Sequence, residues 1–166
     1  MKKRFLLAIV ALILGLLTLG SCQKQGMIYD IYPVEFVFEV TDAHGNNLFD
    51  ESTPGNWLQE PFSATFQGKE YLWPSVQAKA YLAELRGFYI YPKWHTTSDV
   101  VFLRFGELDG AKNWDTDLTI SWPDGSQDII NVKHTCRYNM SGAPKTKTKF
   151  KVNGEPVDDR LIRLKK

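Results

Sequence analysis

The feature that most constrains the fold of this chain is an alternation of apolar and polar residues with a period of two. In residues 34–40 (VEFVFEV) every even-numbered residue is apolar and both glutamates have odd numbers. Successive side chains of a strand point to opposite faces of its sheet, so this pattern predicts a strand with one buried face. Comparable strand signals recur at residues 62–66, 71–73, 88–91, 100–105, 118–122, 128–132 and 149–152. We therefore expect an all-β fold.

Turn sequences separate the predicted strands at short intervals. Glycine, which tolerates a positive φ angle, occurs in the polar stretches at residues 42–47, 67–70 and 123–126. The pair Asn153-Gly154 is a favoured sequence for the two-residue type I′ turn of a hairpin. Seven to nine short strands joined in this way are typical of an antiparallel β-sandwich with immunoglobulin-like architecture. Because no linker or internal repeat divides the chain, we expect one sandwich domain over residues 31–166.

Residues 75–85 are the one segment in which a helix competes with a strand. Ser75 is a suitable N-cap residue at its start. Ala78, Leu82 and Leu85 fall at positions i, i+4 and i+7, which lie on one face of a helix. The sequence therefore predicts a short helix here.

The first 21 residues have the composition of a secretory signal peptide. A basic segment at residues 2–4 precedes an apolar run at residues 5–19, which small residues end. Removing residues 1–21 leaves 145 of the 166 residues and lowers the count of Lys and Arg from 20 to 17, against 19 Asp and Glu. The net charge therefore changes from +1 to −2. This balance excludes a strongly basic nucleic-acid-binding protein.

The sequence LGSC at residues 19–22 resembles a bacterial lipobox, in which a peptidase cuts before the cysteine. The resemblance implies that Cys22 carries a diacylglyceryl thioether and an acylated amino group, and that residues 22–30 form a lipidated tether. Two or more acyl chains hold a protein firmly on a membrane, so we expect a lipid-anchored outer-membrane protein. Surface-exported lipoproteins of the Bacteroidetes usually carry acidic residues directly after the cysteine. The first acidic residue here is Asp30, so a periplasm-facing and a surface-facing domain both stay open.

Cys136 is the only other cysteine, so a lipidated Cys22 leaves it without a partner for a disulfide. The alternation places Val132, His134 and Cys136 on one face of a predicted strand. His134 would then lie about 6–7 Å from the thiol along the strand, too far for direct proton transfer. We therefore expect a buried structural thiol.

The chain as a whole resembles small cell-envelope lipoproteins of the Bacteroidetes, many of which carry one immunoglobulin-like sandwich. The resemblance rests on the lipobox, on the predicted hairpin TISWPDGSQDII at residues 119–130 and on FKVNGEPV at residues 150–157. It implies a fold and a location in the envelope. It implies no activity.

The sequence contains no motif typical of a catalytic centre, a cofactor site or a phosphate-binding loop. We therefore predict a protein without enzymatic activity, cofactor or metal. Asp115 and Asp117 leave two alternatives, because oxygen ligands at alternate positions suit calcium and a pair of carboxylates suits glycoside hydrolysis. A zinc site from His44, His95 and His134 is a further alternative that only tertiary folding could assemble.

Three tryptophans are the candidate ligand-binding residues. Trp57, Trp94 and Trp114 lie in predicted loops among polar neighbours, whereas Trp122 shares a strand face with Ile120. An exposed indole offers a flat apolar surface with one hydrogen-bond donor, which suits a sugar ring or a protein hot spot. The alternative is that these indoles pack over the end of the sandwich.

Lysines alternate with apolar or hydroxyl residues near the end of the chain. Lys145, Lys147, Lys149 and Lys151 would lie on one face of a strand. Such a face could hold an anionic glycan, a lipid headgroup or an acidic partner. The interpretation that we favour is an edge strand whose lysines prevent pairing with other chains.

Together these observations predict a lipid-anchored, non-catalytic binding module of the cell envelope. Its expected partners are the membrane, through the lipid, and a glycan or an envelope protein; no nucleic-acid partner is expected. A glycan-active hydrolase and a structural accessory of an outer-membrane assembly are the alternatives.

Overall fold

A computed structural model describes residues 28–74, 85–91 and 100–166 of the chain. The chain divides into two compact units, residues 1–30 and 31–166, and the fold is that of the second unit. Ten strands occur in the described ranges, where seven to nine are predicted. They are β1 (Val34–Thr41), β2 (Phe62–Phe66), β3 (Lys69–Trp73), β4 (Phe88–Ile90), β5 (Leu103–Leu108), β6 (Trp114–Ser121), β7 (Gln127–Tyr138), β8 (Pro144–Val152), β9 (Glu155–Val157) and β10 (Leu161–Lys165).

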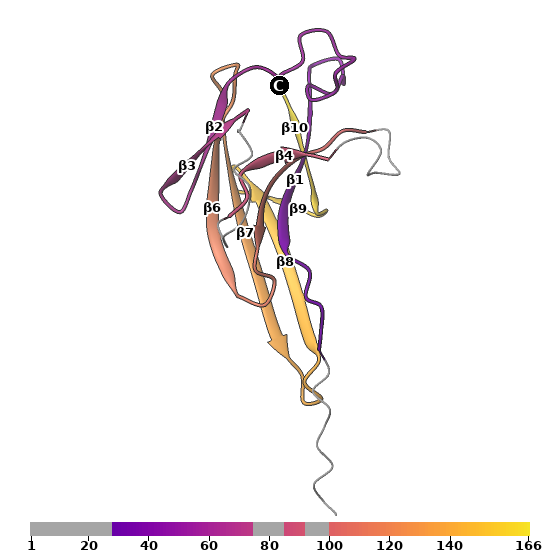
Figure 1. The fold of residues 1–166 in the computed structure, drawn as a ribbon, viewed down its shortest axis with the longest axis vertical. Coiled ribbons are helices and arrows are strands. Elements are labelled where there is room, and N and C mark those ends of the chain that lie inside the picture. The colour runs from indigo at the N-terminus through magenta and orange to yellow at the C-terminus, as the bar shows by residue number, and fades with distance from the viewer. Residues whose placement is uncertain (1–27, 75–84, 92–99) are drawn as a thin grey trace, which may run out of the picture. The chain divides into compact units, whose positions relative to one another are not determined.

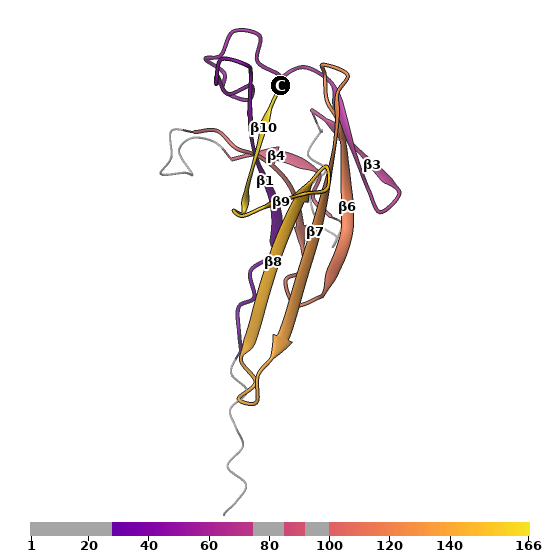
Figure 2. The ribbon, with the colours of Figure 1, turned by 180° about the vertical axis from the view of Figure 1, so that it is seen from behind.

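The strands form two sheets that pack face to face (Figure 1), which confirms the predicted all-β sandwich. One sheet has the order β10-β1-β5-β4 and the other has the order β3-β2-β6-β7-β8-β9. Neighbouring strands are antiparallel except for β1 and β10, which pair in parallel with Val37 opposite Leu161. Long β7 and β8 form a hairpin that continues past the end of β6 (Figure 2), because β6 pairs with β7 only as far as His134.

The core lies between the two sheets and follows the predicted alternation. Val34, Phe36, Phe38 and Val40 of β1 are all buried, whereas the residues between them are half-exposed. The Phe36 ring lies 6.2 Å from the ring of Phe66 in β2, which belongs to the other sheet. Aromatic contacts of this kind join the two sheets.

The turn chemistry that the sequence predicts is present at two hairpins. Asn153 and Gly154, between β8 and β9, have φ angles of 51° and 91°. Gln67 and Gly68, between β2 and β3, have φ angles of 50° and 77°. Two consecutive positive φ angles are characteristic of a type I′ turn, which matches the twist of the flanking strands.

The predicted helix at residues 75–85 lies outside the described residues except for Leu85, which packs against the core. In the ranges that the structure describes, all regular elements are strands. The same ranges contain no helix with the length and apolar composition needed to cross a membrane.

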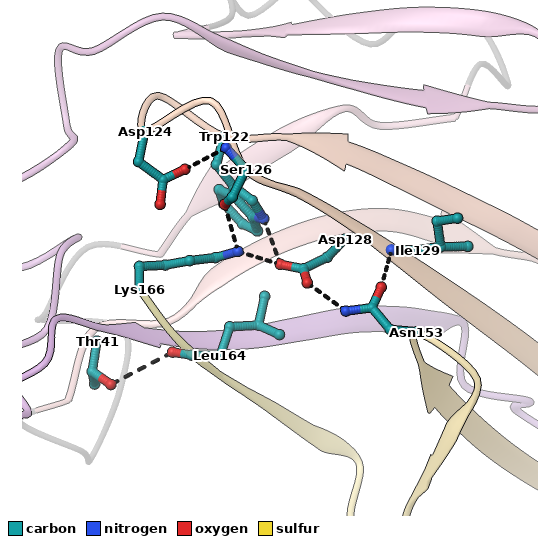
Figure 3. Close-up of polar contacts among 9 residues, drawn as sticks. All are labelled: Thr41, Trp122, Asp124, Ser126, Asp128, Ile129, Asn153, Leu164 and Lys166. Atoms are coloured by element: carbon teal, nitrogen blue, oxygen red, sulfur yellow. Dashed lines mark hydrogen bonds and ion pairs between the residues drawn. The ribbon is translucent and has the colours of Figure 1, made fainter.

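A buried polar cluster joins the two sheets at one end of the sandwich (Figure 3). Lys166, directly after β10, points its ammonium group at Asp128 of β7, with 2.5 Å between Nζ and Oδ2. Asp128 also accepts hydrogen bonds from Trp122 Nε1 at 2.7 Å and from Asn153 Nδ2 at 2.8 Å. Both charged side chains are only 9% exposed. This cluster is therefore a buried ion pair with further hydrogen-bond partners, and it ties the chain after β10 to the other sheet.

Candidate functional site

Trp57 lies in a loop, as predicted, but its indole is part of the aromatic packing. The ring lies 6.4 Å from the Phe49 ring in an edge-to-face arrangement and 5.9 Å from the Trp122 ring. Its backbone carbonyl accepts a hydrogen bond from the indole of Trp73 at 3.3 Å. Trp57 is half-buried and packs against the core, so most of its ring surface is covered by the sandwich.

Trp114 is the first residue of β6 and does not lie in a loop as predicted. Its indole is half-buried and donates a hydrogen bond to the Asp109 carbonyl at 2.8 Å. Trp57 contacts Trp122, which follows the last residue of β6, so Trp57 and Trp114 lie at opposite ends of that strand. The structure does not bring these two candidates together. Trp94 and Cys22 lie outside the described residues.

The lysines near the end of the chain lie on the outer face of β8. Lys145, Lys147, Lys149 and Lys151 are all exposed, whereas Phe150 of the same strand is buried. Strand β8 is at the edge of its sheet over most of its length, because β9 pairs only with residues 150–152. The structure therefore agrees with the predicted edge strand and with the predicted lysine face.

The neighbouring strand β7 adds two cations that the sequence does not point out. Arg137 is directly opposite Lys145, and Lys133 is directly opposite Lys149, in the antiparallel register of β7 and β8. Residues opposite each other in such a pair share one face of the sheet. We call the resulting surface the basic ladder; it consists of Lys133, Arg137, Lys145, Lys147, Lys149 and Lys151.

Most cations of the basic ladder have no ion-pair partner in the described part of the chain, and the charge of Lys151 acts on Asp115 without forming an ion pair. Lys133 forms an ion pair with Asp115 at 3.0 Å. The other five cations form no ion pair with any residue that the structure describes. Like charges directly opposite each other destabilise a sheet, and an edge strand needs no cations on its neighbour to prevent pairing. The two like-charge pairs therefore call for a reason beyond the protection of an edge.

Asp115 and Asp117 lie on the same outer face, on β6. Asp117 accepts a hydrogen bond from Asn131 Nδ2 at 2.9 Å. The hydrogen bond from Lys133, together with the charge of its ammonium group, lowers the pKa of Asp115. A general acid for glycoside hydrolysis needs a raised pKa instead, so this geometry does not favour Asp115 in that role.

The alternatives that involve a metal find no support in the part of the chain that the structure describes. There, no three His, Cys, Asp or Glu side chains are placed so that they could hold a metal ion. His44 is exposed in a turn, whereas His134 is buried on the inner face of β7, and His95 lies outside the described residues.

His134 and Cys136 share the inner face of β7, as the alternation predicts. His134 is held between the carbonyl oxygen of Gly110, 3.0 Å from Nε2, and the hydroxyl of Thr148, 2.7 Å from Nδ1. The carbonyl can only accept, so Nε2 carries a proton and donates. Cys136 is a buried free thiol, which confirms the predicted structural environment.

The basic ladder is therefore the surface whose composition most needs a functional explanation. No family model, no curated protein and no solved structure matches the chain.

Proposed function

We propose that the chain is a lipid-anchored, non-catalytic module of the cell envelope that binds an anionic polysaccharide along the basic ladder. The observation that carries this proposal is the set of five exposed cations without an ion pair in the described part of the chain, three of which directly face another cation. A protein retains a locally unfavourable arrangement where function requires it. An anionic ligand removes the unfavourable term, because it neutralises both members of a like-charge pair.

The geometry of the basic ladder suits a linear polyanion. Alternate residues of one strand lie about 6.6 Å apart, so the four lysines of β8 form a row about 20 Å long. A polymer that carries a carboxylate, sulfate or phosphate on its repeating unit presents charges in a similar row. Binding through several such contacts is strongly weakened by salt, because exposed charges are screened. The regular spacing favours a repeating polymer over an acidic protein surface, whose charges are irregularly placed.

Cys22 is the residue that would hold the module on the membrane. In bacteria that process lipoproteins, we expect the full chain to sediment with membranes and the Cys22→Ser chain to appear in the soluble fraction. The reason is that loss of the acyl chains removes the hydrophobic anchor. Fractionation followed by immunodetection measures the difference. A Cys22→Ser chain that still sediments with membranes in high salt would contradict the lipid anchor.

Reversal of two ladder charges is expected to weaken polysaccharide binding by about tenfold or more, because charge complementarity supplies the attraction. The test uses the chain from residue 22 with Cys22→Ser, and compares it with the same chain carrying Lys149→Glu and Lys151→Glu. Affinity electrophoresis in gels that contain dextran sulfate or neutral dextran measures binding. We expect retardation by dextran sulfate only, and its loss in the double variant.

A matched control separates the basic ladder from net charge alone. Lys112→Glu with Lys165→Glu changes the net charge equally but lies outside the ladder, and retardation should persist. The carboxylate that Lys149→Glu introduces would face Lys133, which offsets the lost attraction between Lys151 and Asp115, so the ladder variant should unfold at about the same denaturant concentration as the parent. Equal retardation of the ladder variant and the parent would contradict the proposal, and so would equal losses in the two double variants.

A further inference from the structure

We propose that the turn of the β7–β8 hairpin contacts the surface of an anionic lipid bilayer and so orients the sandwich on its membrane. The contact surface, which we call the hairpin tip, consists of Arg137, Tyr138, Met140 and Lys145. The proposal rests on the proposed lipid anchor for its biological setting, because the anchor places the domain at a membrane. The surface itself is argued from the residues that follow.

The hairpin tip presents an apolar side chain on an ordered turn. The side-chain oxygen of Asn139 accepts hydrogen bonds from the backbone amides of Ser141 and Ala143, at 3.0 and 2.8 Å, and from the Ser141 hydroxyl at 2.7 Å. The Asn139 backbone amide donates to the Ala143 carbonyl at 3.0 Å. Met140 lies between these residues and is fully exposed. The turn therefore holds a large apolar side chain in solvent instead of folding it against the protein.

Tyr138 is a second apolar group without a covering layer. It continues the inner-face register of His134 and Cys136, which are buried, but it is 59% exposed. The cause lies in the length of the hairpin: β6 ends its pairing at His134, whereas β7 and β8 remain paired as far as Tyr138 and Pro144. The end of the hairpin thus extends beyond its pairing with β6, and the inner face of its last residues is exposed to solvent.

Two cations flank these apolar groups. Arg137 and Lys145 are exposed and directly opposite each other on the outer face of the hairpin. Basic residues that surround exposed apolar and aromatic side chains are typical of surfaces that enter the interface of an anionic bilayer. The phosphate groups of such lipids supply the charge that balances Arg137 and Lys145, and the acyl boundary accepts Tyr138 and Met140.

The hairpin tip lies at the same end of the sandwich as the start of β1. An added Cβ atom at Gly110 would lie 2.0 Å from the carbonyl oxygen of Tyr32, so the chain before β1 passes directly against the segment before β6. His134 binds the carbonyl of the same Gly110, and the hairpin tip begins only three residues after His134. Figures 1 and 2 show this end of the two sheets from opposite sides.

Chain length limits how far this end can lie from the anchor. The nine residues from Cys22 to Asp30 span at most about 32 Å when fully extended. The tether joins the sandwich at Ile31, at the same end as the start of β1 and the hairpin tip, so a bilayer within reach of the anchor is within reach of this end. Charge complementarity and the place where the tether joins the sandwich both favour a bilayer as the occupant of this surface.

The test measures binding of the unlipidated chain to vesicles. The chain from residue 22 with Cys22→Ser is sedimented with vesicles of phosphatidylcholine alone, or of phosphatidylcholine and phosphatidylglycerol in equal parts. We expect binding to the anionic vesicles only. Tyr138→Ser with Met140→Ser is expected to weaken this binding about tenfold, because two apolar side chains no longer leave water.

The ladder variant Lys149→Glu with Lys151→Glu serves as the matched control. Lys149 is four residues from Lys145, about 13 Å along the strand, and exposed charges beyond about 8 Å are screened at physiological salt. We therefore expect this variant to lose less than about threefold in vesicle binding. A polarity-sensitive fluorophore on Met140→Cys should shift to the blue with anionic vesicles, whereas one on Asp124→Cys, at the other end of β6, should not.

Several results would overturn the hairpin tip as a bilayer contact. They are no binding to the anionic vesicles, binding that the Tyr138→Ser, Met140→Ser chain retains, and a larger loss in the ladder variant than in the tip variant. A failure of the proposed function would be detected by separate assays, because retardation by dextran sulfate and the Cys22→Ser fractionation are measured without added vesicles. The Tyr138→Ser, Met140→Ser chain should keep its retardation by dextran sulfate.

Discussion

Replacement of Phe36 by alanine is expected to lower the free energy of unfolding by about 3–5 kcal/mol. The Phe36 side chain is fully buried and belongs to β1 of the four-stranded sheet. Its ring lies 5.6 Å from that of Phe150 and 6.2 Å from that of Phe66, both in the six-stranded sheet. It also lies 6.1 Å from that of Phe105 in its own sheet. Truncation removes contacts with both sheets and leaves a cavity at their junction.

Urea denaturation of the chain from residue 22 with Cys22→Ser measures this loss. Phe36→Leu keeps most of the volume and should cost only about 1–2 kcal/mol. Leu72→Ala is the surface control, because Leu72 is 62% exposed on β3, and such changes usually stay within about 0.5 kcal/mol. If Phe36→Ala cost no more than Leu72→Ala, Phe36 would not join the two sheets as described.

The sequence predicts much of this core because alternation in a strand is a direct consequence of burial on one face. Residues 34–40 show this relation: all four even-numbered residues are buried. The Asn153-Gly154 turn is likewise a local property, since its positive φ angles depend on those two residues. Features that depend only on residues adjacent in the sequence can therefore be predicted without a structure.

Pairing between strands that are distant in the sequence cannot be predicted in the same way. The parallel pairing of β1 with β10 joins Val37 to Leu161, and no local signal connects them. The very short strand β9 also has no alternation long enough to recognise, which is one reason why ten strands occur where seven to nine are predicted. Both features are decided by the packing of the whole domain.

In the candidate site too, the pattern within one strand is predicted from the sequence, whereas the pairing between strands is not. The alternation places the β8 lysines on one face, but only the register of the hairpin places Arg137 and Lys133 opposite them. A turn signal at residues 139–142, where asparagine precedes glycine by three residues, would have indicated that hairpin. For Trp57, polar neighbours in the sequence do not predict exposure, because the indole packs against Trp122, which is distant in the sequence.

Replacement of Asp128 by alanine is expected to lower the free energy of unfolding by about 3–5 kcal/mol, because it leaves the buried ammonium group of Lys166 without its carboxylate. The Lys166 side chain is only 9% exposed. Its remaining hydrogen bond is to the Ser126 hydroxyl at 2.9 Å, and it lies 5.2 Å from the centre of the Trp122 ring (Figure 3). Asp128→Ala with Lys166→Met removes both charges and should recover much of the loss. A double variant no more stable than Asp128→Ala would show that the unpaired charge is not the cause.

The same cluster predicts a specific dependence of stability on pH. Burial disfavours the Asp128 carboxylate, but hydrogen bonds from Lys166, Asn153 and Trp122 outweigh it, so the pKa of Asp128 is held below its usual value. A carboxyl group whose pKa is lower in the folded state stabilises that state above its unfolded pKa of about 3.9. This contribution is lost as the pH falls through the lower, folded pKa. We therefore expect the parent to exceed Asp128→Asn in the free energy of unfolding by an amount that is constant above about pH 5 and becomes smaller on further acidification. Urea denaturation of both proteins at several pH values between neutrality and pH ~2 measures this gap. A gap that widens in acid would mean that Asp128 is protonated more readily in the folded protein than in the unfolded one.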